Sequence, residues 1–234
     1  MHALPTDGHD ETAGTTVMMP DVLPIFPLPR TVLLPGEVLP LHIFEPRYRD
    51  MVRDALGGHR VIGMVQLEPG HEGELAGAPP VRSIGCVGVI AQHQELPDGR
   101  FLLWLLGVER FHIDEELPVS TRYRQVRVDY RPVAGGGDAS AALTPLRAEL
   151  RSTLPGLVQT DGETRSQLTE QLTEVGDDQL IALAAQILEL PADRKQDILE
   201  AATLNDRFTM IYEDLFTHME VHPDLDDVSP ERLH

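Results

Sequence analysis

The sequence predicts an α+β fold, in which a mostly antiparallel β-domain precedes a small all-α helical bundle. In the first half, short apolar and β-branched runs alternate with turns rich in proline and glycine, which is typical of antiparallel strands. A glycine-rich stretch follows, and beyond it the apolar residues recur at helical spacing. We therefore predict a tail at 1–19, a β-domain at 20–133, a linker at 134–143, a helical bundle at 144–222 and an acidic tail at 223–234.

The segment at 24–49 is the part of the chain densest in apolar residues and prolines together. Each proline removes a backbone donor and disfavours helix in the residue before it, so the apolar residues ahead of Pro46 are expected in short extended pieces around a Pro35-Gly36 turn. At Pro46 the period changes to that of a helix, which ends at Gly57-Gly58. The apolar face of this predicted helix consists of Tyr48, Met51, Val52, Ala55 and Leu56.

Further strands are predicted at 60–67, 84–96, 100–106, 108–113 and 123–131. The second and third of these flank Pro97-Asp98-Gly99, a hairpin signal in which proline presets φ and glycine accepts a positive φ. In the last one Val126 and Val128 alternate with polar residues, as in a half-buried antiparallel strand. Such strands with one early helix suit a closed or nearly closed barrel, and the residues alone leave a sandwich open as well.

Five helices are predicted after the linker, which together make a small bundle. Their apolar residues repeat at i, i+3 and i+4, and turn or cap residues separate them. The predicted boundary residues are a Thr144-Pro145 start, a helix at 165–175 stopped by Gly176, a cap at Asp177 or Asp178, a start at Pro191 and a cap at Asn205.

The charge balance limits the classes of partner. The chain has 19 Lys+Arg against 38 Asp+Glu, a formal net charge of −19, which disfavours nucleic acid and anionic membranes. We interpret the basic strip of Arg122, Arg124, Arg127 and Arg131 as the solvent face of a strand. A single cysteine excludes an internal disulfide, and no apolar run marks a signal peptide or a membrane span, so a cytoplasmic location is expected.

Several motifs together resemble the Lon protease N-terminal, or substrate-binding, domain. They are FPLPRTVLLPGEVLPLHIFEPRYRDMV from Phe26, Ile84-Gly85-x-x-Gly88, Leu96-Pro-Asp-Gly-Arg100, Gly107-Val-Glu-Arg-Phe111 and Leu190-Pro-x-x-x-Lys195-Gln196. The resemblance implies a PUA-like β-barrel followed by a helical part. In full-length Lon this unit precedes an ATPase and a protease and helps to capture unfolded or tagged polypeptide. This sequence stops before either catalytic unit would begin, so we expect a stand-alone domain of this type.

No catalytic set is evident in the sequence. Lys195 is the only lysine, and no glycine-rich loop surrounds it, which excludes a phosphate-binding P-loop. A Ser-Lys protease site is not expected either, because the resemblance places Lys195 in a structural helix. His218 and His222 are interpreted as favouring a helix C-terminus and not as metal ligands, and Cys86 as a small buried hydrophobe. We expect no enzymatic activity, no metal and no cofactor.

The predicted function is binding of unfolded or tagged polypeptide, or of a protease or chaperone partner. The candidate binding residues are Pro35, Gly36, Glu37, Phe44, Arg47 and Tyr48, because prolines prevent all apolar residues of 24–49 from facing one core. The alternatives are that Phe44 plugs the barrel end and that Arg47 pairs with Glu45 or Asp50. For the whole chain, the alternative is an adaptor that docks on a partner or on its own copy; self-association is compatible with both.

The run at 101–106, Phe-Leu-Leu-Trp-Leu-Leu, is too apolar for a strand with one solvated face. Either it is a central strand covered on both sides, or Trp104 and its neighbours expose a contact surface. We expect coverage, because the helical bundle needs a surface on which to pack.

Overall fold

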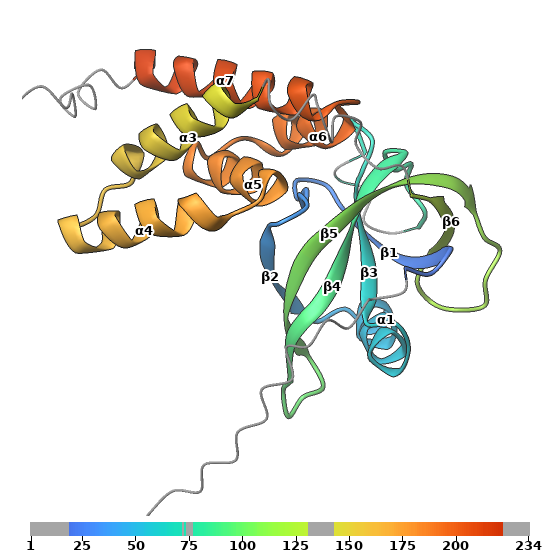
Figure 1. Cartoon of the computed structure of the whole chain (residues 1–234). Coiled ribbons are helices and arrows are strands. Elements are labelled where there is room, and N and C mark those ends of the chain that lie inside the picture. The colour runs from blue at the N-terminus through green and yellow to red at the C-terminus, as the bar shows by residue number, and fades with distance from the viewer. Residues whose placement is uncertain (1–18, 72, 74–76, 131–142, 222–234) are drawn as a thin grey trace, which may run out of the picture.

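The computed structural model describes residues 19–71, 73, 77–130 and 143–221. The predicted tails and the predicted linker lie outside this part of the chain, except for Met19 and Leu143, and the predicted domain boundaries stay a prediction. The described residues form a β-domain with one helix, followed by a group of helices above it (Figure 1). The α+β class predicted from the sequence is therefore confirmed.

Six strands form one sheet in the described residues, in the order β2-β5-β4-β3-β1-β6. Their bounds are β1 Val22–Leu28, β2 Val38–Ile43, β3 Val61–Gln66, β4 Ile84–Glu95, β5 Phe101–Glu116 and β6 Gln125–Asp129. Neighbours are antiparallel, except that β1 and β3 run parallel. Because β6 pairs with β1 and also with the second half of β5, all strands but β2 close into a ring.

The ring encloses an apolar core of its own. Every ring strand contributes to it, and its buried members are Leu23, Ile25, Val61, Val65, Val87, Phe111, Val126 and Val128. A larger apolar core lies on the other side of the strands and continues into the helices. A closed pairing with a filled interior is typical of a small barrel, since closure removes free strand edges. The pairing thus agrees with the predicted barrel and not with a sandwich.

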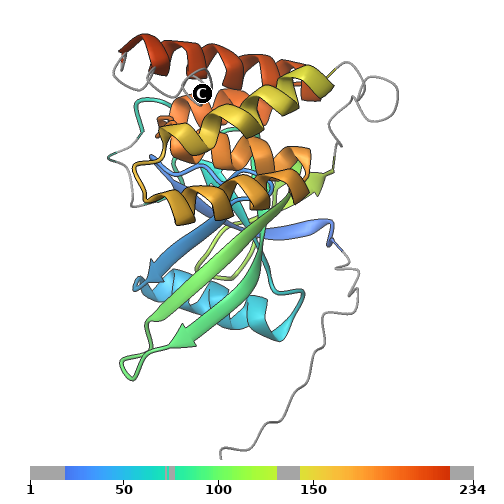
Figure 2. The same ribbon diagram turned by 60° about the vertical axis from the view of Figure 1, so that its left-hand side comes forward.

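Two local predictions in the β-domain are confirmed. Helix α1, Pro46–Gly57, begins at the predicted proline, and its buried residues are Tyr48, Met51, Val52 and Ala55. The hairpin between β4 and β5 turns at Gly99, which has a φ of +77°. Helix α1 lies below the strands, at the end of the β-domain opposite the bundle (Figures 1 and 2).

Strand β5 differs from its prediction. In place of separate strands at 100–106 and 108–113, it is one strand of 16 residues, Phe101–Glu116. The intervening Gly107 does not end the strand; its missing side chain lets β5 pass against the carbonyl of Leu34. The length of β5 allows its first half to pair with β2 and its second half with β6.

Five helices follow in the described part: α3 Thr144–Leu157, α4 Gly162–Glu174, α5 Asp177–Ile187, α6 Ala192–Glu200 and α7 Leu204–Val221. Three predicted caps are wrong by one or two residues. Leu143 and not Thr144 precedes α3, Gly176 precedes α5, and Thr203 caps α7 through reciprocal hydrogen bonds with Asp206. At α5, acidic residues are favourable inside the first turn as well as at the cap, so Asp177 and Asp178 do not fix the position of the cap.

Helix α6 attaches the bundle to the β-domain through polar contacts. Lys195 Nζ lies 2.7 Å from Glu37 Oε1, and both side chains are largely buried. Gln196 donates a hydrogen bond to the carbonyl of Ile84 at 3.0 Å. From β5, Arg110 donates to the carbonyls of Leu199, Glu200 and Ala201, which lie at the end of α6 where helical partners are missing. We call these interactions the α6 contact.

Candidate functional site

One outer flank of the β-domain is apolar. In β2 and β5 alternate side chains point to the same side of the sheet. The register pairs Val38 with Leu106, Pro40 with Trp104 and His42 with Leu102. Phe44 follows β2 on the same side, and its ring centroid lies 6.0 Å from that of His42. We call this surface the β2–β5 face; it consists of Val38, Pro40, His42, Phe44, Leu102, Trp104 and Leu106.

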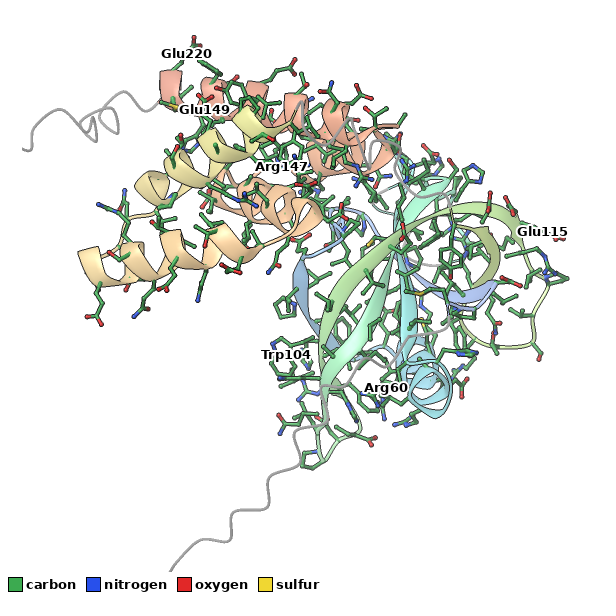
Figure 3. The ribbon with its side chains drawn as sticks, viewed as in Figure 1. Arg60, Trp104, Glu115, Arg147, Glu149 and Glu220 are labelled. Carbon is green, nitrogen blue, oxygen red and sulfur yellow. The ribbon has the colours of Figure 1, made fainter. Side chains whose placement is uncertain are left out.

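The β2–β5 face is open to solvent. Val38 is 55%, Phe44 60% and Leu106 36% exposed, and these are half of the large apolar side chains exposed in the described residues. Figure 3 shows Trp104 on the flank of the strands opposite β6. Single exposed apolar residues are ordinary, but a contiguous apolar surface is typical of a contact site.

The prediction that 101–106 is a central strand covered on both sides is wrong, because only one of its sides is buried. Phe101, Leu103 and Leu105 point into the large core, whereas Leu102, Trp104 and Leu106 point outward. The bundle packs elsewhere, because α6 docks on the β3 and β4 side through Asp193 with Gln66 and through Gln196 with Ile84. The exposed apolar surface that the sequence left as the alternative is therefore present, and its role as a contact site stays a prediction.

The candidates at the turn before β2 lie between the β-domain and α5. Pro35 is buried, and Gly36, at a φ of +83°, lies so close to α5 that an added Cβ would be 2.6 Å from Cα of Gln179. Glu37 accepts a hydrogen bond from the amide of Leu34 at 3.0 Å as well as contacting Lys195. These three residues join the two halves of the structure, and their predicted role in binding stays a prediction.

The other three candidates lie near the start of α1. Phe44 is exposed and does not plug the barrel end. Arg47 Nε lies 3.0 Å from Glu45 Oε2, the pairing that the sequence offered as an alternative. Tyr48 is buried against Phe26 at a centroid distance of 4.3 Å. Arg47 and Tyr48 also line a small pocket with residues from before β6.

The candidate list from the sequence missed most of the β2–β5 face. Val38, Leu102 and Leu106 were not in it, although both sides of 38–44 and 101–106 are apolar. This excess of apolar residues was the signal in the sequence that could have identified the β2–β5 face. Alternation groups the residues by side, but it does not tell which side the rest of the protein covers.

The structure gives no support for a metal centre. Among the described residues, no group of three or more His, Cys, Asp or Glu side chains is arranged to hold an ion. Of the two histidines that the sequence analysis interpreted as residues near a helix C-terminus, His218 lies on α7 and His222 lies outside the described residues. Within the same residues, no helix has the length and apolarity that crossing a bilayer requires.

Cys86 is expected to be unreactive in the folded protein. It is fully buried in β4, and burial raises the pKa of its thiol far above the ordinary value. Since the thiolate is the reactive form, alkylation by iodoacetamide should be at least about 1,000-fold slower in the native protein than in urea, given ordinary domain stability. Mass spectrometry of quenched samples measures this, and fast labelling of native protein would contradict the burial.

The described residues combine a β-sheet whose strands close into a ring, a group of helices attached to it and an exposed apolar face on β2 and β5. A family model described as the ATP-dependent protease La (LON) substrate-binding domain matches residues 22–215. The chain belongs to this family, as the sequence motifs indicated.

Known relatives agree with this assignment. The chain is 27% identical over 206 residues to the Lon protease of Anaeromyxobacter dehalogenans and 29% identical over 209 residues to Lon protease 2 of Myxococcus xanthus. In both cases the match covers 87% of this chain and 24% of the relative, so the chain spans about a quarter of the length of these proteases.

Solved structures show the same fold. The Lon N-terminal domain protein from Xanthomonas campestris superposes with a TM-score of 0.58 at 23% identity, covering 84% of this chain and 97% of that one. The N-terminal domain of Lon protease from the Mycobacterium avium complex gives 0.63 at 18% identity, covering 84% and 99%.

Proposed function

We propose that this chain is a non-catalytic module that binds unfolded polypeptide through the β2–β5 face, in the manner of a Lon substrate-recognition domain. The exposed apolar surface formed by Val38, Phe44, Leu106 and their neighbours carries the proposal. An unfolded chain offers apolar side chains that a folded partner buries, and a contiguous apolar surface binds them by removing both from water.

The mode of binding is expected to be side-chain contact and not strand addition. Strand β2 is an edge strand, and an unpaired edge can accept another strand. Pro40 lies in its middle and has no amide hydrogen, which weakens any ladder that an added strand would form there. Aromatic residues such as Trp104 and Phe44 provide much of the binding energy in side-chain contacts.

We extend the proposal to the enzymatic activity, the cellular location and the partner of the chain. Its family match is to a substrate-binding domain, and its only lysine is engaged with Glu37, so we propose that it neither hydrolyses ATP nor cleaves peptides. The one cysteine and the acidic composition fit a cytoplasmic role in protein quality control. A polypeptide substrate, or a protease or chaperone that receives it, is the proposed partner.

Binding is expected to weaken about tenfold in Phe44→Ser and in Leu106→Ser, the loss typical of one interface hot spot. The ligand is a Trp-free, amidated synthetic peptide rich in leucine and phenylalanine. Because Trp104 is the only tryptophan of the chain, its emission reports contact with the β2–β5 face directly. Anisotropy of the labelled peptide gives the affinity independently.

Phe216→Ser is the matched control. Phe216 is 54% exposed on α7, close to the 60% of Phe44, but it lies outside the β2–β5 face. Equal weakening by this variant, or unchanged affinity in Phe44→Ser, would contradict the proposal. Sedimentation of the free protein tests the adaptor alternative, since a dimer that Leu106→Ser dissociates would assign the face to self-association.

A further inference from the structure

A small pocket lies where the first turn of α1, the segment after β3 and the segment before β6 meet. Its volume is about 50 Å³, and its polar lining consists of Arg47, Arg122 and Arg124 together with Tyr48 and Tyr123. About 10–15 Å³ holds one water molecule, so the pocket suits a single small group and not a length of chain. No acidic residue is among the residues that line it.

The three arginines bring positive charge to one place in a chain with a net charge of −19. Arg124 is fixed by Glu116 at 2.6 Å, and Arg47 contacts Glu45 at 3.0 Å, both carboxylates lying outside the lining. Of the three arginines, Arg122 has the longest ion-pair distance. Its side chain is 69% exposed, and its Nη1 lies 3.6 Å from Asp50 Oδ2. A guanidinium group has five N–H donors, so Arg122 is able to bind an oxyanion in the pocket.

Two further features favour an anionic group there. Arg47 and Tyr48 belong to the first turn of α1, where the helix dipole adds partial positive charge. Among the described residues the Tyr48 hydroxyl makes no hydrogen bond, and burial raises its pKa, so it keeps its proton and can donate. The pocket thus combines guanidinium groups, a helix N-terminus and a hydroxyl donor around space for one group.

We propose that this pocket binds one carboxylate group of a polypeptide ligand, either a C-terminal α-carboxylate or an acidic side chain. The inference rests on the proposed function for the class of ligand, and it adds a second, polar contact apart from the β2–β5 face. A single carboxylate matches the guanidinium geometry and the size of the pocket. A nucleic-acid backbone brings many charges, which the acidic surface repels.

The test uses the full chain labelled with 3-fluorotyrosine, because two of its four tyrosines line the pocket. Three peptides of one sequence are added: one with a free C-terminus, one amidated, and one amidated with an internal aspartate. Fluorine resonances of Tyr48 and Tyr123 should shift with a carboxylate-bearing peptide, while those of Tyr130 and Tyr212 stay in place. Which of the first and third peptides acts distinguishes the two sources of carboxylate.

Loss of the carboxylate is expected to weaken pocket binding about tenfold or more, as for a hydrogen bond to a charged group. Arg122→Gln should weaken it similarly, and because the Arg122 side chain is 69% exposed, the variant should keep the stability of the wild type. Arg127→Gln is the matched control, since Arg127 is 52% exposed on β6 outside the pocket. It should leave affinity unchanged.

Equal binding of all three peptides, or equal effects of the two arginine variants, would overturn the pocket assignment. So would an RNA oligonucleotide that shifts the same two resonances more strongly than the peptides do. Trp104 emission is followed in the same titrations: if the amidated peptide still changes it, the β2–β5 proposal stands while the pocket proposal fails. If the peptides change neither the Trp104 emission nor the fluorine resonances of Tyr48 and Tyr123, the proposed function itself is contradicted.

Discussion

Replacing Gly36 with alanine is expected to lower the free energy of unfolding by about 3 kcal/mol. Its φ of +83° costs an ordinary residue about 1–2 kcal/mol. The added Cβ would also lie 2.6 Å from Cα of Gln179. Since the obstacle is the backbone of α5 and not a flexible side chain, the helix must move, which costs about 1–3 kcal/mol more in a packed site. Urea unfolding followed by circular dichroism measures the loss.

Gly70→Ala separates the two contributions. Gly70 has a φ of +89°, and nothing lies within 4 Å of an added Cβ, so only the backbone cost applies. This variant should lose about 1–2 kcal/mol. Equal losses at the two glycines would contradict the predicted clash between the added Cβ and the backbone of α5.

The elements predicted correctly are those that a local pattern determines. Pro46 at the start of α1, the turn at Gly99 and the apolar repeats of the bundle act over a few residues, so the sequence displays them directly. Caps failed by one or two positions because neighbouring residues such as Gly176, Asp177 and Asp178 are all acceptable near a helix start.

The surroundings of each element could not be predicted in the same way. Glu37 and Lys195 are 158 positions apart, and no local pattern connects them. The sequence identified 101–106 as too apolar for a solvated strand. It could not tell which side of this strand the bundle leaves uncovered, because that also depends on residues far away in the sequence. Phe44 was selected from local density, whereas its partners on β5 follow only from the register with β2.

The attachment of the bundle and the proposed binding surface are adjacent along the chain. The Gly36 turn, which α5 contacts, is followed directly by Glu37 in the α6 contact and by Val38 on the β2–β5 face. Packing on one side of this turn therefore fixes where β2 begins. We infer that the bundle holds the face in position without covering it.

Lys195→Met is expected to lower the free energy of unfolding by about 3 kcal/mol. The side chains of Lys195 and Glu37 are 16% and 9% exposed, and their charged atoms are 2.7 Å apart. Removing the lysine leaves the Glu37 carboxylate in a site with little access to water, where an unpaired charge is costly. The amide of Leu34 remains its hydrogen-bond donor, so the loss falls at the lower end of the usual range.

Glu37→Gln in the same protein should restore about 2 kcal/mol, because the amide oxygen still accepts from Leu34 while the unpaired charge is gone. Arg53→Met provides the exposed comparison: Arg53 and Glu95 are 44% and 52% exposed at 3.1 Å, so its loss should stay below about 1 kcal/mol. Urea unfolding of the wild type, both single variants and the double variant gives the coupling. If Lys195→Met loses no more than Arg53→Met, or if Glu37→Gln adds to its loss, the pair does not attach the bundle as described.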